Sequence, residues 1–188
     1  MCPLPSVTNV LDEYTRLRLR PADAILGREM PHDAAERPRP LVIVHRGFAH
    51  RAPENTLASV NAALELAVDG IEIDVFLSAD GVPVVMHDPT VDRTTDGHGP
   101  VCALTLAQLS ELRVNLGWLD RRCPPEPVPT LREVLQATRG RRLLCIEVKP
   151  KGIEPEVLAE IRRQVGGKDL GRIGEGNGSF DDILELAH

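Results

Sequence analysis

The feature that most constrains this chain is a series of short apolar runs, each followed at once by ionisable residues. LVIV (41–44) precedes His45, and VPVVM (82–86) precedes His87. Runs of Val, Ile and Leu without polar alternation are typical of strands that are covered on both faces. The intervening stretch ENTLASVNAALELAVDG has apolar residues at helical spacing and ends in glycine. This order of strand, helix and strand predicts an α/β fold.

Two further runs carry paired charges. GIEIDV alternates apolar and acidic residues, so Glu72 and Asp74 share one face of the predicted strand. LLCIEVK repeats the arrangement with Glu147 and Lys149. Taken singly, each of these groups also fits an exposed outer face, a solvated histidine or a cross-strand ion pair. Because all four runs carry such groups at or near the same end, we interpret them as one site, as on the C-terminal face of a (β/α) barrel.

The carboxylates Glu72, Asp74 and Glu147 predict a site for one divalent cation. Oxygen ligands without a converging cysteine suit Mg²⁺ or Ca²⁺ rather than zinc, and the choice between the first two stays open. Three carboxylates and one such ion leave a local charge of about -1, which Arg46 and Lys149 would bring to about +1. We therefore expect an anionic substrate.

Composition excludes several classes of function. The 188 residues have a net charge of -6 and 3% aromatic residues, which argues against general binding of nucleic acid or acidic membranes. No apolar run approaches the ~18 residues of a membrane span, and the N-terminus lacks the apolar core of a secretory signal. We therefore expect a cytoplasmic protein without stable membrane insertion. Cys2, Cys102, Cys123 and Cys145 show no CxxC or zinc-like spacing and are expected to be reduced thiols.

The predicted organisation is a leader over residues 1–40, which ends in the proline-containing stretch AERPRP, and a domain over 41–188. A polar, proline-rich insertion occupies 88–142. Capping boxes within it predict helices that begin after Thr105 and Thr130. Beyond it, PEVLAEIRRQV predicts a helix, GRIGEGNGSF has too few apolar residues for a barrel strand, and FDDILELAH predicts a last helix.

The ordered motifs resemble the glycerophosphodiester phosphodiesterase family. HRG, PENT, IEIDV, SADGVPVVMHD, DRTTDGHG, PTLREVL and IEVK carry the resemblance, in order, from about Val42 to Lys149. The resemblance implies a (β/α)8 TIM barrel that hydrolyses glycerophosphodiesters to glycerol 3-phosphate and an alcohol. A complete barrel has about 250 residues and eight strands, so we expect an α/β fold of TIM-barrel type, truncated after about four to five strands.

The resemblance also implies roles for individual residues: His45 and His87 as the catalytic acid/base pair, Arg46 and Lys149 as substrate phosphate contacts, and Glu72, Asp74 and Glu147 as metal ligands. It does not say which histidine is the acid. It implies that the 88–142 insertion shapes the alcohol pocket. Glu54 and Asn55 of PENT are expected to fix the first loop and to cap its helix.

Three interpretations of function stay open. The favoured one is a metal-dependent phosphodiesterase that acts on a small-molecule glycerophosphodiester. The others are an inactive fragment or binding module of the same fold, and a phospholipase D-like relative that acts on lipid. The 3% aromatic content and the lack of an amphipathic anchor disfavour lipid as the substrate. The exposed edge of an incomplete barrel would favour a homo-oligomer.

Overall fold

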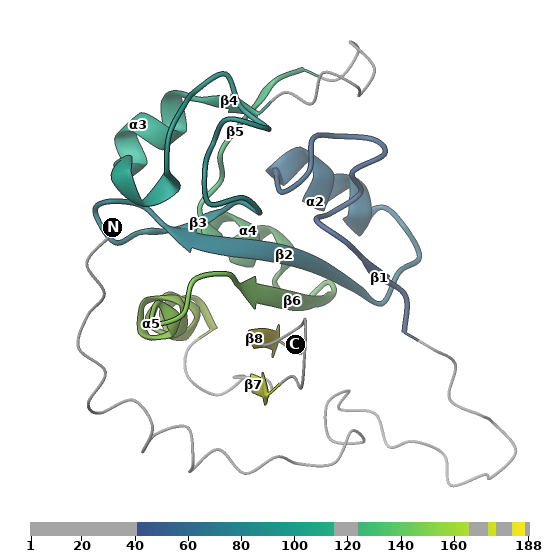
Figure 1. The fold of residues 1–188 in the computed structure, drawn as a ribbon. Coiled ribbons are helices and arrows are strands. Elements are labelled where there is room, and N and C mark those ends of the chain that lie inside the picture. The colour runs from purple at the N-terminus through teal and green to yellow at the C-terminus, as the bar shows by residue number, and fades with distance from the viewer. Residues whose placement is uncertain (1–40, 115–123, 166–172, 176–181, 187–188) are drawn as a thin grey trace, which may run out of the picture.

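The computed structural model describes residues 41–114, 124–165, 173–175 and 182–186 (Figure 1). The predicted leader lies outside these ranges. The helices and strands are β1 (Ile43–Val44), α2 (Leu57–Leu64), β2 (Gly70–Leu77), β3 (Pro83–Val85), the 3₁₀ turn η2 (Val101–Ala103), α3 (Leu106–Glu111), β4 (Arg113–Val114), β5 (Glu126–Pro127), α4 (Leu131–Thr138), β6 (Leu143–Val148), α5 (Glu154–Val165), β7 (Ile173–Glu175) and β8 (Asp182–Leu186).

The sheet is built on the parallel pair β2 and β6, which lie side by side across the middle of Figure 1. Strand β1 adds in parallel to the other edge of β2. Parallel strands linked through helices confirm the predicted α/β class. The run LVIV does not form the expected strand covered on both faces, because β1 lies at the end of the described sheet. Leu41, Val42 and Ile43 are 54%, 52% and 40% exposed.

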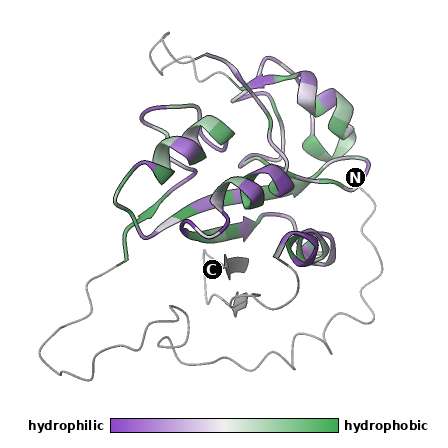
Figure 2. Ribbon diagram, turned by 180° about the vertical axis from the view of Figure 1, so that it is seen from behind, coloured by the Kyte–Doolittle hydropathy of each residue, from purple (hydrophilic) through white to green (hydrophobic). Residues whose placement is uncertain are grey.

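Helices α2, α4 and α5 pack on one face of this sheet and form the main core with it. From β2 the core takes Ile71, Ile73 and Val75, and from β6 it takes Leu144 and Ile146; all five are fully buried. Figure 2 shows that the helices carry both hydrophobic and hydrophilic residues, as expected of helices that bury one side. Because side chains alternate along a strand, the polar residues between these apolar ones are directed to the other face.

Strand β3 runs antiparallel to β2. The turn between them is too short for the crossover that a parallel strand needs, and it contains Gly81 at a φ of +75°. The four apolar runs therefore do not all point the same way, as they would in successive barrel strands. Instead, β3 doubles back along β2, and Met86 N donates to Asp74 O at 3.0 Å.

After β3 the chain makes an excursion over residues 86–129 that begins and ends at neighbouring positions. Val85 N donates to Pro129 O at 2.8 Å, and Val84 forms a β-bridge with Thr130. The excursion contains α3 and the antiparallel pair β4–β5, which lie together in Figure 1. A second, smaller core holds it together: Val84, Met86, Val91, Val101, Leu109, Val114 and Val128.

The predicted capping boxes are both present. Thr105 accepts a hydrogen bond from Gln108 N at the start of α3, and Thr130 accepts one from Glu133 N at the start of α4. In each box the side chain three positions after the cap, Gln108 or Glu133, accepts a hydrogen bond from the backbone N–H of the cap. The helix predicted from PEVLAEIRRQV is also confirmed, as α5.

The last helix predicted from the sequence is wrong. Residues of FDDILELAH form β8, which pairs antiparallel with β6, and Ile173–Glu175 of the glycine-rich stretch form β7 against β8. The edge of β6 that faces away from β2 offers unpaired backbone N–H and C=O groups, and a short segment satisfies them as a strand. Such pairing depends on the tertiary neighbour rather than on local helical spacing.

The expectation of reduced thiols is wrong for Cys102, which is disulfide-bonded. Spacing along the sequence did not reveal this, because a disulfide depends on which cysteines meet in space. Cys2 and Cys123 lie outside the described residues, and Cys145 is buried on β6. In the part of the chain that the structure describes, no helix is long and apolar enough to cross a membrane.

Candidate active site

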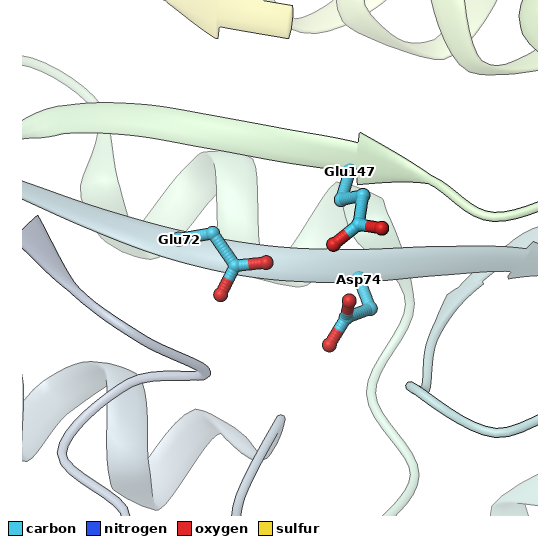
Figure 3. A group of neighbouring side chains, drawn as sticks. All are labelled: Glu72, Asp74 and Glu147. Carbon is cyan, nitrogen blue, oxygen red and sulfur yellow. The ribbon is translucent and has the colours of Figure 1, made fainter. Parts of the chain in front are cut away.

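Three carboxylates converge on the face of the sheet opposite the main core (Figure 3). Asp74 on β2 and Glu147 on β6 are register partners, and Glu72 precedes Asp74 by two positions on the same face. One ligand atom from each lies within 4.8 Å of the others. Asp74 is fully buried and Glu72 is 9% exposed. The parallel register therefore produces the cluster that the two strand patterns predict.

Glu72 is held in a setting that disfavours its charge. Burial raises its pKa, the negative charges of Asp74 and Glu147 add to this, and together they bring the pKa to about 7, although a backbone hydrogen bond from Arg46 opposes the shift. Among the described residues, Glu72 Oε1 is buried without a hydrogen-bond partner. A buried carboxylate oxygen left without a partner is costly, and a divalent cation would satisfy it. The oxygen-only donor set fits a hard cation.

The loop after β1 places a cationic side chain beside this cluster. Arg46 and Gly47 both have positive φ, at +55° and +72°. The left-handed turn lets Arg46 N donate to Glu72 Oε2 at 2.9 Å, while its guanidinium lies 3.0 Å from Glu54 Oε1 and 3.4 Å from Asp74 Oδ2. A non-glycine residue in this conformation is uncommon, and such residues cluster at functional sites.

His45 borders the same cluster from the exposed side. Its Nε2 lies 3.8 Å from Glu72 Oε2 and accepts from Arg46 Nε at 3.3 Å. Burial and the positive charge of Arg46 lower the pKa of His45, and the charge of His87 adds to this lowering. The two predicted acid/base histidines are thus close enough to interact electrostatically.

Asn55 does not cap α2, as was expected, but holds a neighbouring carboxylate. The N-cap of α2 is Thr56, which forms a capping box with Ser59. Asn55 adopts a φ of +56° and donates from Nδ2 to Asp74 Oδ2 at 2.8 Å, while its Oδ1 accepts from Asp74 N at 3.3 Å. It therefore fixes both the backbone and the side chain of one predicted metal ligand, as outer residues of metal sites commonly do.

Lys149 lies at the other side of the cluster, just beyond β6. Its ammonium is 2.9 Å from Asp74 Oδ1 and 2.7 Å from Glu147 Oε1. Burial by itself would lower the pKa of Lys149, but the two carboxylates outweigh burial and raise it. Six of the seven predicted site residues are thus joined by direct contacts, and two of them are cations.

His87 is connected to the cluster through residues that the sequence predictions did not include in the site. Its Nδ1 lies 2.6 Å from Asp88 Oδ1. Arg93 bonds both Asp88 and Glu54, and Glu54 in turn holds Arg46. Asp88 and Arg93 both stand in quoted motifs, but a motif does not say which partners its residues have in space.

Comparison with known proteins identifies the family. Residues 45–169 match the model of the glycerophosphoryl diester phosphodiesterase family. The chain belongs to this family. The phosphodiesterase resemblance drawn from the motifs is therefore confirmed.

Individual phosphodiesterases are similar to this chain in sequence and in structure. Glycerophosphodiester phosphodiesterase 1 of Bos taurus is 43% identical over 123 residues, which cover 65% of this chain and 37% of that protein. A crystal structure of the Agrobacterium tumefaciens phosphodiesterase has a TM-score of 0.62 at 40% identity, covering 67% of this chain and 54% of that one. An Oleispira antarctica phosphodiesterase, solved with the product sn-glycerol-3-phosphate, has a TM-score of 0.60 at 39% identity, covering 68% and 52%.

The chain spans about half the length of these solved relatives and less of the bovine protein. The predicted TIM-barrel type is confirmed by the solved phosphodiesterases, and the described sheet corresponds to part of that fold.

Proposed function

We propose that this chain hydrolyses glycerophosphodiesters to glycerol 3-phosphate and an alcohol with the help of one divalent cation, Mg²⁺ or Ca²⁺. The observation that carries the proposal is the convergence of Glu72, Asp74 and Glu147 with Arg46 and Lys149 on one face of the sheet. Membership of the family supports the reaction class. The product held by the Oleispira antarctica relative supports the substrate class.

Glu72, Asp74 and Glu147 would hold the cation. When bound, such an ion supplies Lewis-acid stabilisation to a phosphoryl oxygen. Arg46 and Lys149 would contact the remaining phosphate oxygens. The guanidinium can bind two of them at once, and the ammonium acts as a point charge. Both cations already lie against the carboxylates, so they border the place where phosphate would sit.

His45 and His87 would divide the proton transfers. One accepts the proton of the attacking hydroxyl, and the other gives a proton to the departing alkoxide. The attacking hydroxyl belongs either to water or to the neighbouring position of glycerol, which would form a cyclic phosphate first. The burial and the neighbouring cation that lower the pKa of His45 favour its neutral form at physiological pH.

Three further predictions accompany the proposal. The domain is proposed to occupy residues 41–188 after a leader over 1–40, and the insertion over 88–142 is proposed to shape the alcohol pocket. The cytoplasmic location stays a prediction, and the disulfide of Cys102 counts against it because disulfides persist mainly in oxidising compartments.

The proposal is tested by following glycerol 3-phosphate release from glycerophosphocholine. We expect EDTA to abolish release, Mg²⁺ or Ca²⁺ to restore it, and Glu72→Gln to remain inactive with either ion. Arg132→Gln is the matched control, because it removes an Arg–Glu contact between α4 and α5. Absence of release from a folded chain would contradict the proposal. Binding of glycerol 3-phosphate without turnover would then support a binding module, and release of the headgroup alcohol from an intact phospholipid would support a phospholipase D-like activity.

A further inference from the structure

We propose that Arg93 is a positioning residue that aligns the two sides of the site, acting on Arg46 through Glu54 and on His87 through Asp88. The inference rests on the proposed function, because it concerns how that site is assembled. Arg93 lies in the excursion, whereas Glu54 and Arg46 belong to the loop that precedes α2. A single side chain thus links segments that are far apart in the sequence.

The guanidinium of Arg93 makes two forked contacts. On one side, Nε donates to Asp88 Oδ2 at 2.5 Å and Nη2 to Asp88 Oδ1 at 3.1 Å. On the other, Nη2 donates to Glu54 Oε1 at 2.6 Å and Nη1 to Glu54 Oε2 at 3.3 Å. All three nitrogens are used. Two bidentate contacts fix the orientation as well as the distance of both carboxylates.

Through Glu54, Arg93 controls the position of Arg46. Glu54 Oε1 accepts from Arg93 Nη2 and also from Arg46 Nη1, at 3.0 Å. Burial by itself would raise the pKa of Glu54, but the hydrogen bonds and charges of Arg93 and Arg46 lower it below its ordinary value. Glu54 is therefore an anion that holds two guanidinium groups at once. Arg46 is in this way turned toward Asp74.

Through Asp88, Arg93 controls the ring of His87. The hydrogen bond from Arg93 lowers the pKa of Asp88 to about 2, although burial partly opposes it. An ionised carboxylate can only accept hydrogen bonds, so the contact of 2.6 Å requires His87 Nδ1 to carry the proton. Nε2 of the neutral ring is then left with its lone pair for proton transfer.

Lysine could not replace Arg93 in both tasks. Its ammonium is a point donor on a flexible stem and lacks the planar fork that meets two carboxylates. If Arg93 only anchored the excursion to the rest of the fold, removing it would lower stability and leave the ring of His87 and the action of Arg46 unchanged. If it aligns the site, both would change.

The decisive measurement is the tautomer of His87, read from ¹⁵N shifts in long-range ¹H–¹⁵N spectra at a pH where the ring is neutral, and assigned with His87→Gln. We expect the Nδ1–H form in the wild-type chain and in Arg132→Gln, and a mixture richer in Nε2–H in Arg93→Gln. An unchanged tautomer in Arg93→Gln would overturn the inference. If that variant does not fold, Arg93→Lys, which keeps the charge, decides the same question.

Kinetics give an independent test if the chain turns over. We expect Arg93→Gln to lower kcat about 10–100-fold, in the range of outer residues that orient a reactive group, and to raise KM because Arg46 is no longer held. Arg93→Lys should retain less than half of the activity that Arg93→Gln loses. The control Arg132→Gln should keep the wild-type kcat and KM. The tautomer needs no turnover, so a wild-type chain without activity but with the expected tautomer would count against the proposed function alone.

Discussion

Glu72 is a buried carboxyl group whose protonation depends strongly on its surroundings. Burial and two neighbouring carboxylates raise its pKa from 4.5 to about 7. A folded chain with such a group binds more protons than the unfolded chain between these values, so the stability it contributes is present below about pH 4.5 and is lost as the pH rises to about 7. In EDTA, we therefore expect the free energy of unfolding to fall over this window by at most about 3 kcal/mol.

Denaturant unfolding at several pH values between 5 and 8 measures this effect. His45, whose pKa is lowered, acts in the opposite direction in part of the window, so the informative quantity is the difference between the wild-type chain and Glu72→Gln. We expect the substitution to stabilise the metal-free chain at pH 8 and to have little effect at pH 5. Equal effects at both pH values would show that Glu72 is not a buried acid with a raised pKa.

Some of the residues around Glu72 could be predicted from the sequence and others could not. Strand alternation is a local pattern, so it places Glu72 with Asp74 and Glu147 with Lys149. The meeting of the two pairs depends on the parallel register of β2 and β6. Arg93 depends on Glu54, which lies 39 positions earlier. No local pattern links the two, because their contact depends on how the excursion folds back.

At the scale of elements, the loop between β1 and α2 depends on the close approach of its backbone to the helix. A Cβ at Gly47 would clash with Ser59 Oγ and would lie 2.8 Å from the backbone carbonyl carbon of Ser59. Gly81 has a similar φ of +75°, but nothing lies within 4 Å of the same atom there. The two positions share a φ that an alanine rarely adopts, and they differ in the space that a Cβ would meet.

We therefore expect Gly81→Ala to lower the free energy of unfolding by about 1–2 kcal/mol, the cost of the left-handed conformation. Gly47→Ala should cost about 1–3 kcal/mol more, because a backbone atom cannot move aside as a side chain can. Urea unfolding of both variants tests this. Equal losses would mean that the loop moves freely away from α2.

The helices that were predicted correctly are marked by residues within their own sequence. The capping boxes at Thr105 and Thr130 consist of neighbouring residues, and both helices begin where the boxes place them. Strand β8 carries no such signal, because the open edge of β6 decides its conformation. The direction of β3 could have been inferred from the short turn before it, which is compatible only with a hairpin.

At the scale of the whole molecule, the edge of the described sheet at β1 carries exposed apolar residues. Leu41, Val42 and Ile43 are large apolar residues with at least 40% exposure, and an apolar strand at a sheet edge is a template for pairing. We predict self-association through this edge. Sedimentation velocity should show a coefficient that rises with protein concentration for the wild-type chain.

Val42→Lys should suppress that rise, because a charged edge resists pairing. Ser110→Lys is the control, since it adds the same charge to an exposed position on α3. A wild-type coefficient that does not depend on concentration would contradict the prediction, as would equal suppression by both variants.

The excursion over 86–129 leaves and rejoins the sheet at adjacent backbone positions and has a core of its own. Such a segment can be exchanged between relatives without disturbing the strands that bear the carboxylates. Preference for one alcohol could therefore diverge in evolution while the hydrolytic residues on β2 and β6 are inherited unchanged. On the roles proposed above, a segment transplanted from a relative would need its own counterparts of His87, Asp88 and Arg93. Only then would its arginine bind Glu54 of the recipient and hold the transplanted histidine in place.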